Sequence, residues 1–186
     1  MVRWLYIFLC CITLVSEIQG VRYAMRIKKD PLSTYRTRRN LRRSHEPRGT
    51  ARKREYNIFV VQKHDASHLH YDFRLAIGGV LVSWAVPKGI PRRAGIKRLA
   101  MRTDDHPLEY ADFEGTIPAG NYGAGTVEIW DHGSYKNEKE SSMQRCLKKG
   151  VLEFSLSGSK LKGIYVLVRM ENKPNQWLLM KKKVGN

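Results

Sequence analysis

Short apolar or alternating runs, separated by Gly, Pro, Asp and Asn, fill the chain from Asn57 onward. Runs of this length between turn-forming residues are typical of antiparallel strands. Gly78 and Gly79 separate two of the runs and predict a tight hairpin. The pattern predicts strands near residues 58–62, 69–77, 80–86, 97–103, 126–130, 152–156, 164–170 and 177–182.

A helical pattern interrupts the strands at residues 138–149, where Met143, Cys146 and Leu147 follow the i, i+3, i+4 spacing. Gly150 stands where a helix C-cap is expected. Many short strands with one surface helix favour a closed or nearly closed barrel, because closure removes exposed strand edges. The predicted fold is therefore mostly β, a small single-domain β-barrel with one or two flanking helices.

We place the barrel at residues 57–183. The N-terminal third of the chain precedes it and divides into two segments. Residues 1–24 include an apolar stretch that is too short to span a bilayer but has the length of a signal-peptide core. No small-x-small cleavage site follows, and Met25 offers a second start, so we interpret 1–24 as a non-structural leader or a mis-called start. Export remains the alternative. Residues 25–56 form a basic arm with no sustained apolar period, and we expect little regular structure there.

Charge points to a polyanionic partner, because the net charge is +17 and the isoelectric point is near 10.0. Nucleic acid and an anionic membrane surface both fit, and the arm alone could also be a solvated tail. Cys10, Cys11 and Cys146 cannot form a disulfide framework, because the first two are adjacent. A reducing compartment, and hence a cytoplasmic location, is expected.

Candidate chemistry gathers in one strand, where His68, His70, Asp72 and Arg74 alternate with apolar residues. Side chains two apart in a strand share a face, so these four form a polar row. Imidazole and carboxylate bind Mn²⁺ or Zn²⁺, and a guanidinium grips phosphate with two prongs. A half-buried strand also needs a polar outer face, which is the simpler explanation. The clustering of three of the six histidines, with His64 as the third, favours the metal site.

Other candidates are less specific. His106, in a turn-like segment before Pro107, fits a catalytic acid, a phosphate ligand or a surface histidine. Lys88 and Arg98, at a loop and a strand start, are equally well explained as solvated charges. The glycine-rich run 115–125 lacks the Lys-Ser/Thr ending of a phosphate-binding loop, so we interpret it as a turn or lid.

Several motifs together resemble one family. They are 64–75 (HDASHLHYDFRL), 83–89 (SWAVPKG), 105–108 (DHPL), 113–115 (FEG) and 123–127 (GAGTV). In this order they closely resemble the 3′-phosphoesterase module of bacterial DNA ligase D and its stand-alone archaeal relatives, over roughly Leu32 to Lys182. The resemblance implies a β-barrel and a Mn²⁺-dependent enzyme of non-homologous end joining. Such an enzyme resects 3′-terminal ribonucleosides and then removes the remaining 3′-phosphate.

The resemblance also implies roles for individual residues. The metal ligands of the family fall on His64, His70 and Asp72, whereas many relatives have Arg at His68. The remaining positions are listed by implied role: catalytic or phosphate-contacting Arg74, Arg98, His106 and Tyr110; further substrate contacts Gln62 and Lys88; and arm residues Arg39 and Glu46. Asn40 stands where the family has an acid next to the arm arginine.

The expected partner is the 3′ end of a primer-template duplex, with separate ligase and polymerase polypeptides and no membrane. We expect a monomer. Two alternatives stay open. One is a non-catalytic basic nucleic-acid-binding barrel whose histidines are structural, and the other is an exported phosphatase acting on small phosphate esters.

Overall fold

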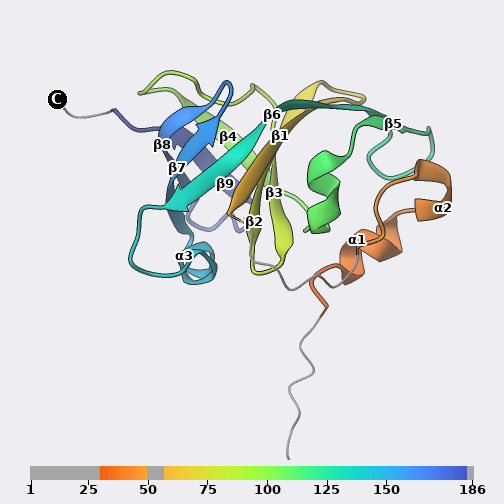
Figure 1. The fold of residues 1–186 in the computed structure, drawn as a ribbon, viewed down its shortest axis with the longest axis horizontal. Helices are drawn as coiled ribbons and strands as arrows, with labels where there is room; N and C mark the ends of the chain where they lie inside the picture. The colour runs from red at the N-terminus through yellow and green to blue at the C-terminus, as the bar shows by residue number, and fades with distance from the viewer. Residues whose placement is uncertain (1–29, 50–56, 184–186) are drawn as a thin grey trace, which may run out of the picture.

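The computed structural model describes residues 30–49 and 57–183 (Figure 1). The predicted leader at 1–24 lies outside these residues, as do both ends of the arm. Within the described ranges, no helix is long and apolar enough to cross a membrane.

Eight antiparallel strands close into a barrel, which confirms the predicted fold. The ring order is β1-β2-β3-β4-β9-β8-β7-β6, and β6 pairs back onto β1. The strands are β1 Ile58–Asp65, β2 His70–Ile77, β3 Val80–Val86, β4 Lys97–Arg102, β6 Gly125–Asn137, β7 Val151–Gly158, β8 Lys162–Arg169 and β9 Gln176–Lys181. The predicted Gly78-Gly79 hairpin joins β2 to β3, where both glycines have positive φ.

The strand β6 is longer than the predicted 126–130. Its first half pairs with β1 and with a short strand, β5 Gly115–Ile117, while its second half pairs with β1 and β7. The β1–β6 register shifts between Val61 and Gln62, where Trp130 has no partner in β1, so a bulge interrupts the ladder at this point. The expectation of a turn or lid at 115–125 is therefore wrong for Gly115–Ile117, which form a strand.

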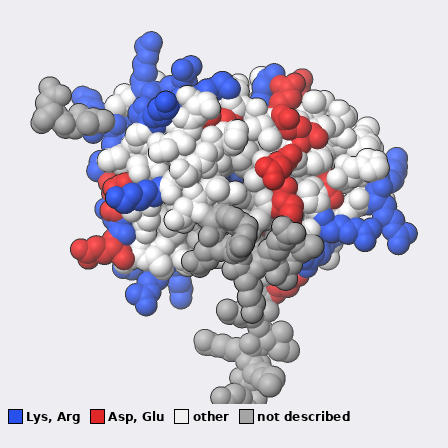
Figure 2. Space-filling model, in the orientation of Figure 1, with Lys and Arg blue, Asp and Glu red and all other residues white. Residues whose placement is uncertain are grey.

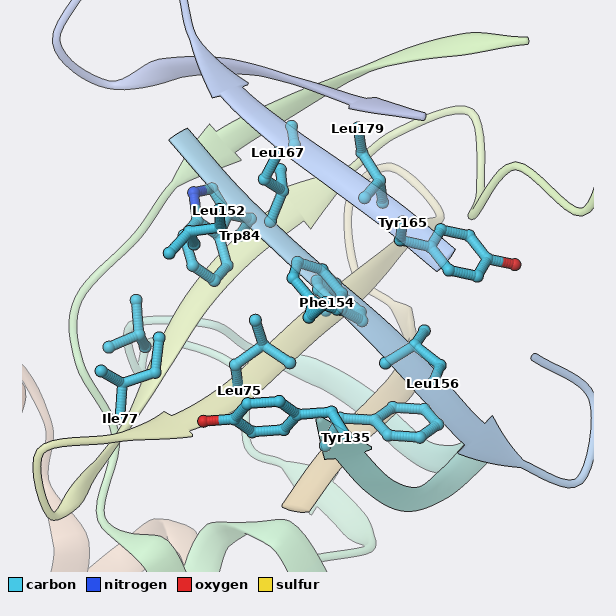
Figure 3. Packing of buried hydrophobic residues seen from close by; sticks show 14 of the residues in the cluster. Leu75, Ile77, Trp84, Tyr135, Leu152, Phe154, Leu156, Tyr165, Leu167 and Leu179 are labelled. Atoms are coloured by element: carbon cyan, nitrogen blue, oxygen red, sulfur yellow. The ribbon is translucent and has the colours of Figure 1, made fainter. Parts of the chain in front are cut away.

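Aromatic and branched side chains fill the interior of the barrel (Figure 3). Phe73 stacks on Phe154 with ring centroids 5.9 Å apart, and Trp84 meets Trp177 edge to face at 5.6 Å. Such geometries are the favoured ones for buried aromatic pairs. Because side chains occupy the lumen, polar residues on the same strands must face outward.

Two short helices in the arm cover one side of the barrel. They are α1 Ser33–Arg38 and α2 Leu41–Ser44, and the expectation of little regular structure is wrong for these residues. Tyr35 anchors α1, because its ring is fully buried and its hydroxyl donates to the Pro47 carbonyl at 2.7 Å. The ring packs with Tyr110 of the 3-10 helix η2 Leu108–Asp112. Figure 1 shows α1 and α2 on the side that carries β5.

The predicted surface helix is present as α3 Met143–Lys149, shorter at its start than 138–149. Ser142 caps it by accepting a hydrogen bond from the Arg145 backbone N–H, and Gly150 ends it with φ 87°. Met143 and Cys146 are the buried residues, as the helical spacing predicted.

Candidate active site

The pleat of β1 and β2 puts one row of polar side chains on the outer wall of the barrel. Phe73 and Leu75 belong to the interior cluster, so Asp72 and Arg74 point to the opposite face. This confirms the predicted alternation along β2. Cross-strand pairing then sets Asp72 beside Gln62 of β1.

Three of these side chains form a metal-ligand cluster. His64, His70 and Asp72 each offer a ligand atom, and these atoms lie within 4.8 Å of one another. His64 Nδ1 is 3.5 Å from Asp72 Oδ2, and His70 Nε2 is 3.6 Å from Asp72 Oδ1. Two imidazoles and a carboxylate at this spacing suit a divalent transition metal.

Backbone carbonyls fix the tautomers of both imidazoles. His64 Nε2 lies 3.0 Å from the Gly123 carbonyl oxygen, and His70 Nδ1 lies 2.9 Å from that of His68. A carbonyl can only accept, so these nitrogens carry the protons and the other ring nitrogens present lone pairs toward Asp72. Such carbonyl partners are the usual outer support of metal-binding histidines.

Asp72 is held as a carboxylate. Burial alone would raise its pKa, but the adjacent Arg74 guanidinium outweighs burial and holds the pKa below the ordinary value. The carboxylate is only 6% exposed, so its negative charge is available to a cation at neutral pH without competition from bulk water.

Arg74 organises the outer wall from a position that is 2% exposed. Its Nε donates to Gln62 Oε1 at 2.7 Å, and one terminal nitrogen donates to Asp72 Oδ2 at 2.9 Å. The other terminal nitrogen lies 2.9 Å from both Ser83 Oγ and His106 Nδ1. A planar guanidinium with five N–H groups can donate to Gln62, Asp72 and Ser83 at once, and Arg74 also lies against His106, so it connects the metal cluster to that side of the site.

Gln62 is fully buried and supports Arg74. While its Oε1 accepts from Arg74, its amide nitrogen donates to the carbonyl oxygens of Tyr110 at 3.1 Å and Phe113 at 2.8 Å. This amide ties β1 to the segment around η2. Substrate contact by Gln62 stays a prediction, because the structure occupies both ends of the amide with protein groups.

His106 sits between two guanidinium groups. Arg74 approaches Nδ1, and an Arg39 terminal nitrogen lies 3.1 Å from Nε2. Burial and these cations, Arg74 first, lower the pKa of His106 well below its ordinary value. The ring is therefore neutral at pH 7 in the free protein, with the Asp104 carbonyl 2.9 Å from Nδ1.

The arm brings a second charged pair to the same place. Arg39 donates from Nε to Glu46 Oε1 at 3.2 Å, and both side chains are buried. A further Arg39 nitrogen lies 3.6 Å from Asp104 Oδ2. Glu46 Oε2 has no hydrogen-bond partner among the residues described, which leaves a buried acceptor at the edge of the site.

A pocket of about 200 Å³ opens over these groups. Its lining includes the metal cluster and the following predicted residues: Arg39, Glu46, Arg74, His106 and Tyr110. Tyr110 lies against Arg74, whose guanidinium carbon is 4.8 Å from the ring centroid, and burial raises its pKa. Lys and Arg side chains project at the edge of the molecule where α1 and α2 lie, beside a band of Asp and Glu side chains (Figure 2).

The amino-acid sequence of the chain matches a known family model. The model for the DNA ligase D 3′-phosphoesterase domain covers residues 62–169, which is more than half of the chain. The chain belongs to this family. The matched range holds the three cluster residues, Arg74, His106 and Tyr110, whereas Arg39 and Glu46 lie outside it.

Curated relatives of this phosphoesterase family carry the same domain within longer proteins. The chain is 47% identical over 160 residues to the multifunctional non-homologous end joining protein LigD of Pseudomonas aeruginosa, covering 83% of the chain and 19% of the relative. The LigD proteins of Mycobacterium tuberculosis and Mycolicibacterium smegmatis are 46% and 42% identical over 80% and 83% of the chain. The chain spans about a fifth of the length of these relatives, 19% and 21% for the latter two.

Three positions implied by the phosphoesterase family resemblance do not line the pocket: Gln62, whose amide is bound by protein groups, Arg98 and Lys88. Arg98 of β4 pairs with Leu179 and shares the strand face of the buried Ala100, so it lies on the inner face of the wall. Its Nε is buried without a partner in the described ranges. Lys88 is exposed in the turn after β3. Their roles stay predictions.

Three residues of this candidate site escaped sequence reasoning. Ser83 accepts from Arg74, Asp104 holds the arm arginines, and Tyr122 lines the pocket from the β5–β6 loop. Only Tyr122 carried a signal, because it is an aromatic residue inside a glycine-rich run.

Proposed function

We propose that the chain is a Mn²⁺-dependent 3′-end-healing phosphoesterase. It would resect a 3′-terminal ribonucleoside as a phosphodiesterase and then remove the 3′-phosphate as a phosphomonoesterase, in repair by non-homologous end joining. The observation that carries the proposal is the convergence of two imidazole lone pairs and a carboxylate beside buried guanidinium groups, in a chain of the DNA ligase D 3′-phosphoesterase family.

The residues present fit a divalent cation. His64, His70 and Asp72 would hold it, and their nitrogen and oxygen donors suit Mn²⁺. The bound ion would supply charge neutralisation and polarise a phosphoryl oxygen. Arg74 keeps Asp72 ionised and oriented, so the ligand set is assembled before the ion arrives.

Around the cluster, Arg39 and His106 would act on the phosphate. Arg39 is buried and lines the pocket, where its charge would offset that of a terminal phosphoryl group. An incoming phosphate dianion offsets the two guanidiniums that disfavour a proton on His106. Binding therefore raises its proton affinity, so the ring could take up a proton at Nε2 and pass it to the leaving oxygen.

A labelled primer-template tests this directly. The substrate carries a 5′ label and a single ribonucleotide at the 3′ end, and it is incubated with the protein and Mn²⁺. We expect stepwise conversion to a 3′-phosphate and then to a 3′-hydroxyl, which separate ligase and polymerase polypeptides would use. His64→Ala should abolish both steps. Full activity of that variant would refute the ligand assignment.

His68→Ala is the matched control. His68 is exposed and precedes β2, and it contributes its backbone carbonyl to His70, which alanine retains. It should behave like the wild type. A non-catalytic nucleic-acid-binding barrel remains the competing function, favoured by the arginine-lined surface of the arm. Salt-sensitive DNA binding with no conversion of the substrate would support it.

A further inference from the structure

One exposed aromatic residue stands at the mouth of the pocket. Tyr122 lies in the loop between β5 and β6 and is 46% exposed. Single exposed apolar residues are ordinary on protein surfaces. Tyr122 differs because it lines the pocket that contains His64, Asp72 and Arg74.

Two arm arginines hold the ring in place. The Arg38 and Arg39 guanidinium carbons are 5.4 Å and 4.9 Å from its centroid. Both arginines are themselves held by Asp104, at 3.3 Å and 3.6 Å. Both distances are within the range of cation–π contact, and the side chain still keeps much of its surface exposed. The ring is therefore a positioned surface rather than a free side chain.

The loop also links the ring to the metal cluster. The residue after Tyr122 is Gly123, whose carbonyl oxygen accepts a hydrogen bond from His64 Nε2–H. A flat aromatic surface thus lies one residue from a group that fixes a predicted metal ligand.

A shallow basic groove runs along the arm beside the pocket, and the two share Arg39. It has a volume of about 780 Å³ and is lined by these arginines: Arg36, Arg38, Arg39, Arg42 and Arg48. Arg39 lines both the groove and the pocket, and Arg38 lines the groove and contacts Tyr122. The groove suits a phosphodiester backbone that leads to the pocket, because its charges alone attract successive phosphates.

We infer that Tyr122 is the stacking platform for the base of the 3′-terminal nucleotide. The inference rests on the proposed function and specifies the conformation of the bound substrate: the last base of the 3′ end has left the helical stack. The terminal phosphate lies at the metal cluster, the base lies on the Tyr122 ring, and the preceding phosphates follow the arm groove. Stacking on an aromatic ring tolerates any base, which suits an enzyme that heals ends of arbitrary sequence.

The test compares two 3′-phosphate ends that differ only in the terminal base, one with a base and one abasic. For the wild type, we expect KM to be about 5- to 150-fold lower for the end with the base, which corresponds to the usual value of one stacked base. Tyr122→Ala should raise KM for that end by the same factor, with a smaller change in kcat. It should leave KM for the abasic end unchanged, and Tyr122→Phe should behave as the wild type.

Equal KM values for the two ends in the wild type, or an equal rise for both ends in Tyr122→Ala, would overturn the inference. A second measurement does not need activity. A 2-aminopurine at the 3′ end should lose fluorescence on binding the wild type in EDTA, and should keep it with Tyr122→Ala. If the wild type converts neither end, the proposed function fails, and the fluorescence still decides whether the base stacks.

Discussion

Replacing Arg74 with lysine tests the claim that one guanidinium assembles the site. Lysine keeps the positive charge near Asp72 but has a single nitrogen, so it cannot serve Gln62 and Ser83 as well. Two or more buried partners then lose a hydrogen bond. At about 1–3 kcal/mol for each unsatisfied buried group, the free energy of unfolding should fall by about 2–6 kcal/mol.

Urea unfolding measures this change, and the slope m should stay constant if only stability is affected. Calorimetric titration with Mn²⁺ measures the second consequence, a weaker affinity by about 10–100-fold, because Asp72 loses its support. Arg36→Lys is the control, because Arg36 pairs with Asp30 at an exposed position and should change stability by less than about 1 kcal/mol. A loss below about 1 kcal/mol for Arg74→Lys, with unchanged Mn²⁺ affinity, would refute the reasoning.

Three other perturbations probe separate parts of the molecule. The folded protein keeps His106 neutral, whereas the unfolded chain takes up a proton as the pH falls. The free energy of unfolding should therefore fall by about 1 kcal/mol between pH 6.5 and pH 5.5, as measured by urea unfolding at each pH. In His106→Gln this pH dependence should be flatter. Asp131→Ala should cost about 2–4 kcal/mol in urea unfolding with unchanged Mn²⁺ affinity, because its carboxylate accepts three backbone N–H groups between β7 and β8. Gly125→Ala should weaken Mn²⁺ binding in calorimetry, because a Cβ there would lie 2.4 Å from the carbonyl oxygen of Asp65, the residue after His64. Gly79→Ala is the control and should leave Mn²⁺ binding unchanged, because the space around Gly79 is open.

The alternation along β2 was enough to predict the polar outer row. The bounds of β3 also followed from the sequence, because Gly79 and Pro87 bracket an apolar run. The length of β6 did not, because Asp131, His132 and Gly133 interrupt its apolar pattern. The strand continues there because it pairs on both sides, which depends on partners far away in the chain.

The arm shows a second limit of sequence reasoning. Its helices α1 and α2 are too short to show an apolar period, and they are held by single contacts such as Tyr35 with Pro47. The shared face of His70 and Asp72 was predictable from the alternation along β2, whereas His64 was placed beside them only by the family resemblance. The inward position of Arg98 was not, because it follows from the register of β4 against β9.

The strict alternation of β2 separates two kinds of evolutionary constraint. Side chains at odd positions, such as Phe73 and Leu75, pack in the lumen, and those at even positions, such as Asp72 and Arg74, line the pocket. A substitution at an odd position changes the lumen and leaves the pocket-lining side chains present, and a substitution at an even position does the reverse. New substrate preferences could therefore arise by exchanging wall and loop residues while the packed lumen stays the same.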